Sequence, residues 1–175
     1  MTSTDGKNVF LCVWLIVAAA PVAGCSDDAA KLESDAGGAS EDSGSGVSPC
    51  AQYVDQVKSF HLGIEQQGKS GRIRARLVSA RPSSPQKYLN DWTLDFLDAK
   101  GNALSDVEIT MARSYMPVHG HDGTFPPTVT KLEEAGRMQV DGLNLWMRGP
   151  WQIQLNVSSA ATGADYIEFA VCIEE

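Results

Sequence analysis

The chain has 175 residues and carries 14 basic and 22 acidic side chains, which gives a net charge of −8. This length leaves room for one domain with appendages. The acidic balance excludes nucleic acids from the expected partners.

Residues 1–24 have the features of a bacterial lipoprotein signal peptide. Lys7 is followed by an apolar run from Val9 to Ala20, which is too short to span a bilayer comfortably. A basic start, an apolar middle and small residues at the end are typical of a secretion signal. The stretch "VAGC", which ends at Cys25, resembles the lipobox, whose cysteine is diacylated and becomes the mature N-terminus. We therefore expect a lipid anchor on Cys25 rather than an uncleaved membrane helix.

Residues 25–49 are expected to form a lipidated cysteine followed by a disordered acidic tether. The segment 26–49 contains six acids, one lysine and no aromatic residue, so it cannot bury enough apolar surface to fold. As a flexible coil it would span roughly 25–30 Å. Ser26 stands after the cysteine, where no aspartate is present. By analogy with enterobacterial sorting, we expect the protein in the cell envelope, on the outer membrane and facing the periplasm.

The cysteines fit an exported protein. Cys12 would leave with the signal peptide, Cys25 would carry lipid, and Cys50 and Cys172 remain at the two ends of the segment 50–175. An even pair in an oxidising compartment predicts a disulfide. The alternative is two unpaired buried thiols. A bridge would close a very long loop, worth roughly 4–5 kcal/mol in the chain-entropy model.

The segment 51–68 opens the domain without firm periodicity. It could form a helix with one apolar face, or it could be an irregular lead-in to a strand. Alternating apolar and polar residues then predict strands in six places: 72–80, 92–98, 107–115, within 131–147, 151–157 and 165–173. Gly, Pro and Asp separate these short runs. The pattern predicts an all-β, antiparallel β-sandwich of six or seven strands. Trp92 is the expected central core tryptophan.

The order of motifs over residues 71–173 resembles the YtkA-like domain and the related FixH-like proteins. That pattern has a Pro-rich turn, an Asn-x-Trp strand, a D-x-x-G-x-x-L turn, MPxHGH, and a late G-L-x-F-x-M-x-G-x-W run. Here these are Pro82 and Pro85, Asn90 and Trp92, Asp98 with Gly101 and Leu104, Met116 to His121, and Gly142 to Trp151. Leu145 departs from the pattern, because an aromatic residue is usual there. The resemblance implies an immunoglobulin-like sandwich, and FixH-like relatives are associated with copper handling during cytochrome oxidase assembly.

The stretch "MPVHGHDGTFPP", Met116 to Pro127, holds two of the three histidines. Catalysis is not expected from it. The chain has no Gly-x-Ser-x-Gly elbow and no phosphate-binding glycine loop. A zinc hydrolase would need three ligands and an open position. His119, His121 and Asp122 could supply them, but no His-Glu-x-x-His helix accompanies them.

Metal binding is the stronger interpretation of this stretch. His119 and His121 would point to one side of an extended segment. Met116 lies three residues before the first of them. Thioether sulfur prefers Cu(I), and imidazole serves both oxidation states of copper. Together with the family's association, this favours copper over zinc. Met111 and Met138 are more readily core residues, and Met147 could pack against its tryptophan neighbours.

The sequence thus predicts a membrane-anchored accessory protein of the cell envelope that binds copper through Met116, His119 and His121. In the alternative, the histidines fix the shape of a loop by bonding backbone carbonyls. The domain would then be a metal-free interaction module that contacts another envelope protein.

Overall fold

The computed structural model describes residues 48–57 and 59–174. The predicted signal peptide, Cys25 and the tether as far as residue 47 lie outside the described residues. The domain predicted for residues 50–175 is therefore seen almost in full.

The described chain contains one short 3₁₀ helix and nine strands. In chain order these are η1 (Ala51–Tyr53), β1 (Glu65–Gln67), β2 (Ile73–Arg81), β3 (Tyr88–Asp98), β4 (Glu108–Met116), β5 (His121–Asp122), β6 (Thr128–Lys131), β7 (Arg137–Leu145), β8 (Gly149–Ser159) and β9 (Gly163–Ile173). The six long strands are those that the sequence predicts, and β1, β5 and β6 are short additions. The lead-in 51–64 is irregular after η1, as one of the two alternatives proposed.

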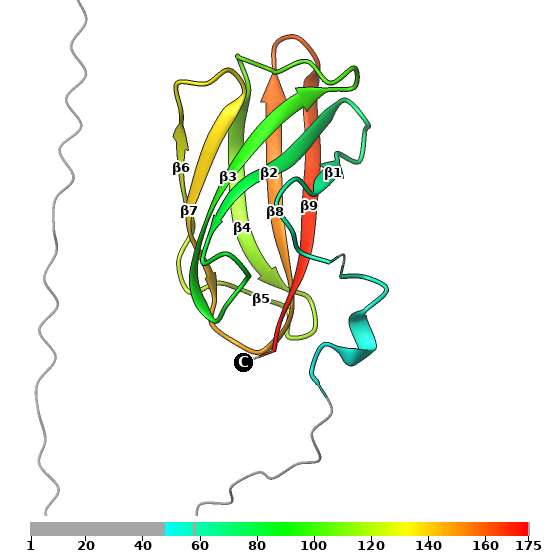
Figure 1. Cartoon of the computed structure of the whole chain (residues 1–175), viewed down its shortest axis with the longest axis vertical. Coiled ribbons are helices and arrows are strands. Elements are labelled where there is room, and N and C mark those ends of the chain that lie inside the picture. Colours follow the sequence, from blue (N-terminus) through cyan, green and yellow to red (C-terminus); the bar gives the residue numbers. More distant parts are fainter. Residues whose placement is uncertain (1–47, 58, 175) are drawn as a thin grey trace, which may run out of the picture. The chain divides into compact units, whose positions relative to one another are not determined.

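The strands form two antiparallel sheets (Figure 1). One has the order β1-β2-β3-β7-β6 and the other the order β5-β4-β8-β9. The prediction of an all-β antiparallel fold is confirmed, and the two sheets are consistent with a β-sandwich. Apolar residues alternate inward from both sheets because successive side chains of a strand point to opposite faces.

The core between the sheets is aromatic at its centre. Trp92 is 1% exposed, as predicted, and its ring lies 5.5 Å from that of Phe60 and 5.6 Å from that of Phe169. Phe60 belongs to the irregular lead-in, so this segment is packed onto the sandwich although it has no regular structure. On β9 it is Ile167, not Tyr166, that faces inward, which settles a register that the sequence left open.

A β-bulge in β4 overturns one prediction. The pairing of β4 with β8 shifts between Ile109 and Met111. A bulge adds one residue to one strand and so reverses which side chains face inward beyond it. Met111 is therefore half-buried and outside the core, while Met116 is buried. The prediction that Met138 is a core residue is confirmed.

A disulfide joins Cys50 to Cys172, with the two Cα atoms 5.9 Å apart. The predicted pairing is confirmed. The bridge fastens the segment before β1 to the end of the last strand, across a sequence separation of 122 residues. Ser48 adds a hydrogen bond of its hydroxyl to the Glu174 carboxylate.

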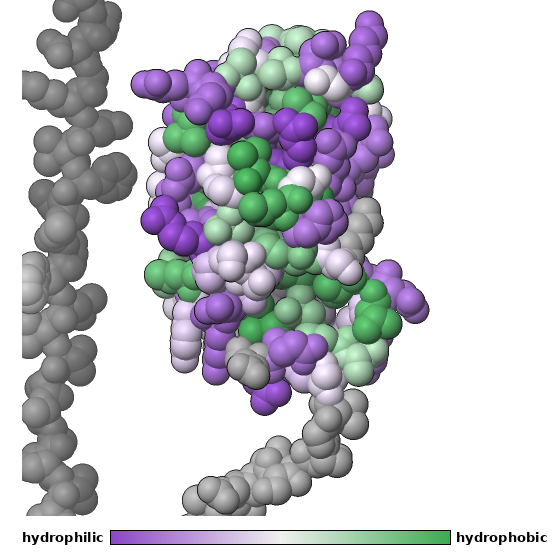
Figure 2. Space-filling model, viewed as in Figure 1, coloured by the Kyte–Doolittle hydropathy of each residue, from purple (hydrophilic) through white to green (hydrophobic). Residues whose placement is uncertain are grey.

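The surface mixes both kinds of residue. Figure 2 shows the strongest hydrophobic colour over the middle and lower part of one face, while hydrophilic residues predominate toward its upper end. Within residues 48–57 and 59–174, no helix is long and apolar enough to cross a membrane.

Candidate metal centre

The histidine stretch forms a β-hairpin between β4 and β5. The chain turns through residues 117–120, and the amides of His119 and Gly120 donate hydrogen bonds to the Met116 carbonyl over 3.3 and 2.9 Å. Gly120 has a φ of +68°, a conformation that glycine adopts without steric cost. The sequence did not predict β5, because a two-residue strand gives no periodic signal.

The hairpin register places Met116 directly opposite His121. Residues that face each other across an antiparallel pair have side chains on the same face, with Cβ atoms about 4.5–5.5 Å apart. Met116 is 1% exposed, and a Cβ on Gly149 would come within 2.8 Å of its methyl group. Glycine at 149 therefore leaves the space that the thioether side chain occupies.

The His121 ring is packed among other rings. It stacks on Trp146 with centroids 4.9 Å apart and planes 25° apart. The ring of His119 also stacks on it, with centroids 5.8 Å apart and planes 12° apart. The ring of Trp151 is tilted against it, with centroids 5.9 Å apart and planes 59° apart. Trp146 and Trp151 are contributions that the sequence interpretation missed, although both belong to the late run that carries the family resemblance.

The two nitrogens of His121 have different surroundings. Nδ1 lies 3.2 Å from the carbonyl oxygen of Asp122. A carbonyl can only accept, so Nδ1 is the donor in this contact, and in the neutral ring Nε2 then keeps its lone pair. Nε2 is buried and has no hydrogen-bond partner among the described residues. Buried polar atoms are nearly always satisfied, and a histidine that binds a metal usually donates its other N–H to a carbonyl or carboxylate.

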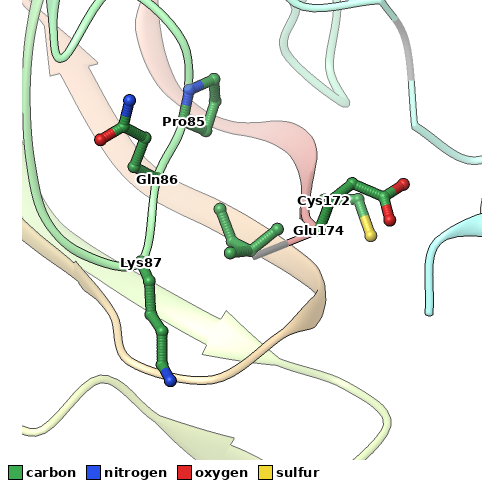
Figure 3. Close-up of a pocket in the computed structure, with 6 residues that line it drawn as sticks. Pro85, Gln86, Lys87, Cys172 and Glu174 are labelled. Carbon is green, nitrogen blue, oxygen red and sulfur yellow. The ribbon is translucent and has the colours of Figure 1, made fainter. Parts of the chain in front are cut away.

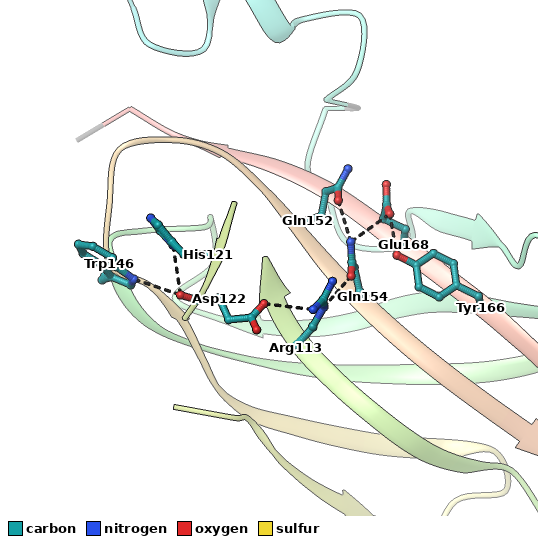
Figure 4. A network of polar contacts seen from close by, with 8 residues as sticks. All are labelled: Arg113, His121, Asp122, Trp146, Gln152, Gln154, Tyr166 and Glu168. Atoms are coloured by element: carbon teal, nitrogen blue, oxygen red, sulfur yellow. Dashed lines mark hydrogen bonds and ion pairs between the residues drawn. The ribbon is translucent and has the colours of Figure 1, made fainter. Parts of the chain in front are cut away.

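A polar network fixes the strand that carries His121 (Figure 4). The side chain of Asp122 pairs with Arg113 at 3.4 Å, and Arg113 Nε donates to Gln154 at 2.7 Å. Gln154 is in turn linked to Glu168 on β9. The hairpin is therefore tied to the outer side of the four-stranded sheet, and the His121 backbone is held in place.

At the far side of this network, the hydroxyl of Tyr166 donates to Glu168 over 2.8 Å. Burial and this hydrogen bond raise the pKa of Tyr166. The phenol therefore stays protonated at neutral pH, and the network keeps its donor.

His119 is placed differently from His121. It is exposed on the turn, and its ring centroid lies 5.8 Å from that of His121. Imidazole lone pairs lie in the ring plane, so two stacked rings do not aim at one point. Because His119 is exposed, its side chain can rotate, whereas the His121 ring is held between its neighbours.

Several pockets lie near the disulfide and the histidine turn, and two of them bear on the site. Met116 and His119 line one of about 160 Å³, together with Tyr53 and Pro150, so the buried thioether borders an opening. A larger one, of about 440 Å³, lies beside the disulfide and is lined by Gln86, Lys87 and Glu174, among others (Figure 3). The Lys87 side chain extends away from Glu174 there, so these charges do not converge on one point.

Among the described residues, no three His, Cys, Asp or Glu side chains come together as a metal site. The Met and His donors predicted from the sequence are a different set. The structure brings Met116 and His121 together as a cross-strand pair and His119 next to them.

The fold and this hairpin define a class, a two-sheet β domain with a Met/His turn at one end. Comparisons with protein-family models, curated proteins and solved structures found no match to the chain.

Proposed function

We propose that this protein is a lipid-anchored accessory protein of the bacterial cell envelope that binds copper as Cu(I) through Met116, His119 and His121. The observation that carries the proposal is the Nε2 atom of His121. It is buried, lacks a hydrogen-bond partner among the described residues, and belongs to a ring whose other nitrogen donates to a carbonyl.

The donor types support copper over other metals. A thioether is a soft ligand that suits Cu(I), and imidazole binds copper in both oxidation states. Hard cations such as Mg²⁺ and Ca²⁺ prefer oxygen ligands. Bound Cu(I) would give the protein a soft-metal cargo that it could carry or hand on. Met116 and His121 offer their donors from fixed positions, and His119 would complete the set from the mobile side.

The strand order supports the immunoglobulin-like and YtkA-like assignment. In the order of the strands within each sheet, β2, β3, β7 and β6 correspond to strands A, B, E and D of an immunoglobulin-like domain, and β4, β8 and β9 to C, F and G. An immunoglobulin-like sandwich is what the family resemblance implies.

The disulfide supports an exported location, because such bonds persist in oxidising compartments. The lipobox-like "VAGC" supports the anchor. A lipid on Cys25 would hold the domain at a membrane, and we propose the outer membrane, facing the periplasm.

Titration of the protein with Cu(I) against a competing chelator tests the copper proposal. Removing a group that only hydrogen-bonds to a metal ligand typically lowers metal affinity by roughly 10–100-fold. His121→Ala removes a ligand itself and should lower the affinity by at least as much. His119→Ala should cost less, because that ring is exposed and not preset. Met116→Leu keeps the buried volume and should also lower the affinity.

Two matched controls separate ligation from general damage. Met138→Leu changes another buried methionine, and His61→Ala another exposed histidine. Neither should change Cu(I) binding. Equal affinities for wild type and His121→Ala, with both folded by circular dichroism, would leave the metal-free interaction module as the function.

The interaction module is the second candidate, and one observation favours it. Large apolar side chains are exposed around the histidine turn, among them Val118 and Trp146. Exposed apolar surface marks contact sites. Copper binding and surface contact are compatible, so the titration decides only the first.

A further inference from the structure

The sandwich has two ends, and they differ in their exposed side chains. The tether end comprises Ser48 and η1, the start of β3, the β4–β5 turn, the β7–β8 turn and the end of β9. These lie together because Tyr88 pairs with Leu145, Gly149 pairs with Ile173, and Cys50 is bonded to Cys172. In Figure 1 the C-terminus, β5 and η1 are at this same, lower end. The far end comprises the turns 68–72, 99–106, 132–136 and 160–162.

Five of the seven large hydrophobic side chains that are exposed among the described residues lie at the tether end; the other two are Leu62 beside β2 and Phe125 between β5 and β6. Four of the five belong to the turns and strand starts of the tether end: Tyr88 (60% exposed), Leu89 (53%), Val118 (50%) and Trp146 (36%). Val54 follows η1 at the same end. Among the described residues, none of the large exposed hydrophobic side chains comes from the far end, whose turns carry charged residues such as Lys100, Glu133 and Glu134.

Tyr88 is held in this exposed position against a steric cost. Its φ is +77°, which is an outlier for a bulky residue. Asn90 is fully buried and enforces the conformation, since its amide donates to the carbonyls of Gln86 and Tyr88 and accepts from the Gln86 amide. Strain of this kind persists where the surroundings impose it and is common at binding sites.

The place where the chain leaves the domain indicates what covers this surface. Ser48 is the first described residue and lies at the tether end. Only 22 residues separate it from Cys25. A lipid on Cys25 would therefore keep this end close to the bilayer, whereas a soluble partner would have to reach it by diffusion. Linking two binding sites through a short chain makes the second contact intramolecular, with an effective concentration in the millimolar range. A weak affinity of this end for lipid is then enough to hold it at the bilayer.

We propose that the tether end docks on the phospholipid bilayer to which Cys25 anchors the chain, with Tyr88, Leu89, Val118 and Trp146 entering the interfacial region. Trp and Tyr favour the membrane interface because their rings combine an apolar body with a polar group. The exposed charge here is mixed, with Lys87 and Arg148 near Asp55 and Glu174, so the apolar contacts carry the docking. The inference rests on the proposed lipid anchor and adds an orientation to it.

Trp146 is the natural reporter of docking. The mature chain would retain Trp92, Trp146 and Trp151, and both Trp92 and Trp151 are buried. The lipidated chain is reconstituted in phosphatidylcholine vesicles, with and without phosphatidylglycerol, that contain brominated phospholipid. Emission should be quenched in both compositions, and Trp146→Phe should abolish the quenching.

Variants of the apolar residues define the surface. Leu89→Ser and Val118→Ser should each lower the docked-to-undocked ratio by about tenfold, the factor expected from withdrawing one aliphatic side chain from lipid. Leu62→Ser is the matched control, because Leu62 is equally exposed but lies beside the middle of β2. It should leave quenching unchanged.

Vesicle flotation distinguishes a failed anchor from failed docking. A chain that floats but is not quenched overturns the docking and leaves the anchor intact, and a protein partner or a second copy then becomes the occupant of this surface. A chain that does not float overturns the anchor. In that case the Cys25→Ser chain is measured at high lipid concentration, where absence of quenching overturns the docking as well.

Discussion

At the far end of the sandwich, Asp98, Asp106 and Asp165 each accept backbone N–H groups of a turn. At the tether end, a disulfide and stacked rings take that role, and polar groups are left unsatisfied, with Nε2 of His121 as the clearest case. The far end is thus held mainly by its own carboxylates, although the Thr162 hydroxyl there is buried without a hydrogen-bond partner among the described residues. The tether end retains an imidazole nitrogen without a hydrogen-bond partner among the described residues, a strained tyrosine and exposed apolar side chains. These are features of a binding site.

This contrast teaches where function can be sought in a small β domain. A turn whose backbone is capped by its own carboxylates has little left to offer a ligand. A turn fixed from outside, by a covalent bond or by packing, can keep its side chains uncommitted.

The largest effect is expected from removing the disulfide. Replacing Cys50 and Cys172 together by serine should lower the free energy of unfolding by about 4–5 kcal/mol, because the unfolded chain regains the entropy of a very long loop. Urea denaturation measures this. A loss below about 1 kcal/mol would mean that the tether end is held by packing alone.

A smaller loss is expected from Asp165→Ala at the far end. The carboxylate accepts the amides of Ser70, Arg72 and Ile73 over 2.8–3.0 Å. Leaving buried N–H groups without an acceptor should cost about 2–4 kcal/mol in unfolding free energy. Copper affinity should stay unchanged, and a fall in affinity would show that the two ends are coupled.

The far-end carboxylates also predict an acid dependence. Burial acts to raise the pKa of Asp165, but amides donated by Ser70 and Ile73 outweigh it, so its pKa lies below the ordinary 3.8. Burial also acts to raise the pKa of Asp95. The hydrogen bonds and charges of Arg137 and Arg76 outweigh burial, so this pKa is lowered as well. The stability that these ionised groups contribute is complete above pH 3.8 and is lost as the pH falls through the lower folded-state values.

Urea unfolding between neutral pH and about pH 3 measures this loss. In Asp165→Asn the loss should be shallower, because one of the two groups no longer titrates. The same pH dependence in the variant and the wild type would remove Asp165 from the explanation.

The smallest effect on stability is expected from Tyr88→Asn. Asparagine tolerates positive φ better than tyrosine, so the free energy of unfolding should stay equal or rise by at most about 1 kcal/mol. Contact with brominated lipid should nevertheless weaken. A stability loss would mean that the exposed ring packs on the domain and is not kept for a partner.

Much of this fold could be predicted from the sequence, and some of it could not. Alternation identified the six long strands, since an inward residue at every second position leaves a clear period. It failed at Met111, because a bulge leaves no mark on composition. It also missed β5. The pairing of Met116 with His121 across the hairpin was therefore not predicted, and only His119 and His121 were expected to point to the same side. The stacking of Trp146 on His121 joins residues distant in sequence and needed the folded chain.

The central claim is that Nε2 of His121 and the thioether of Met116 serve one metal ion. X-ray absorption spectroscopy of the protein loaded with Cu(I) tests it most directly. We predict both sulfur and nitrogen neighbours around the copper, with the sulfur lost in Met116→Leu and a nitrogen lost in His121→Ala. A copper environment that is the same in all three proteins, or that lacks sulfur in the wild type, would contradict the claim.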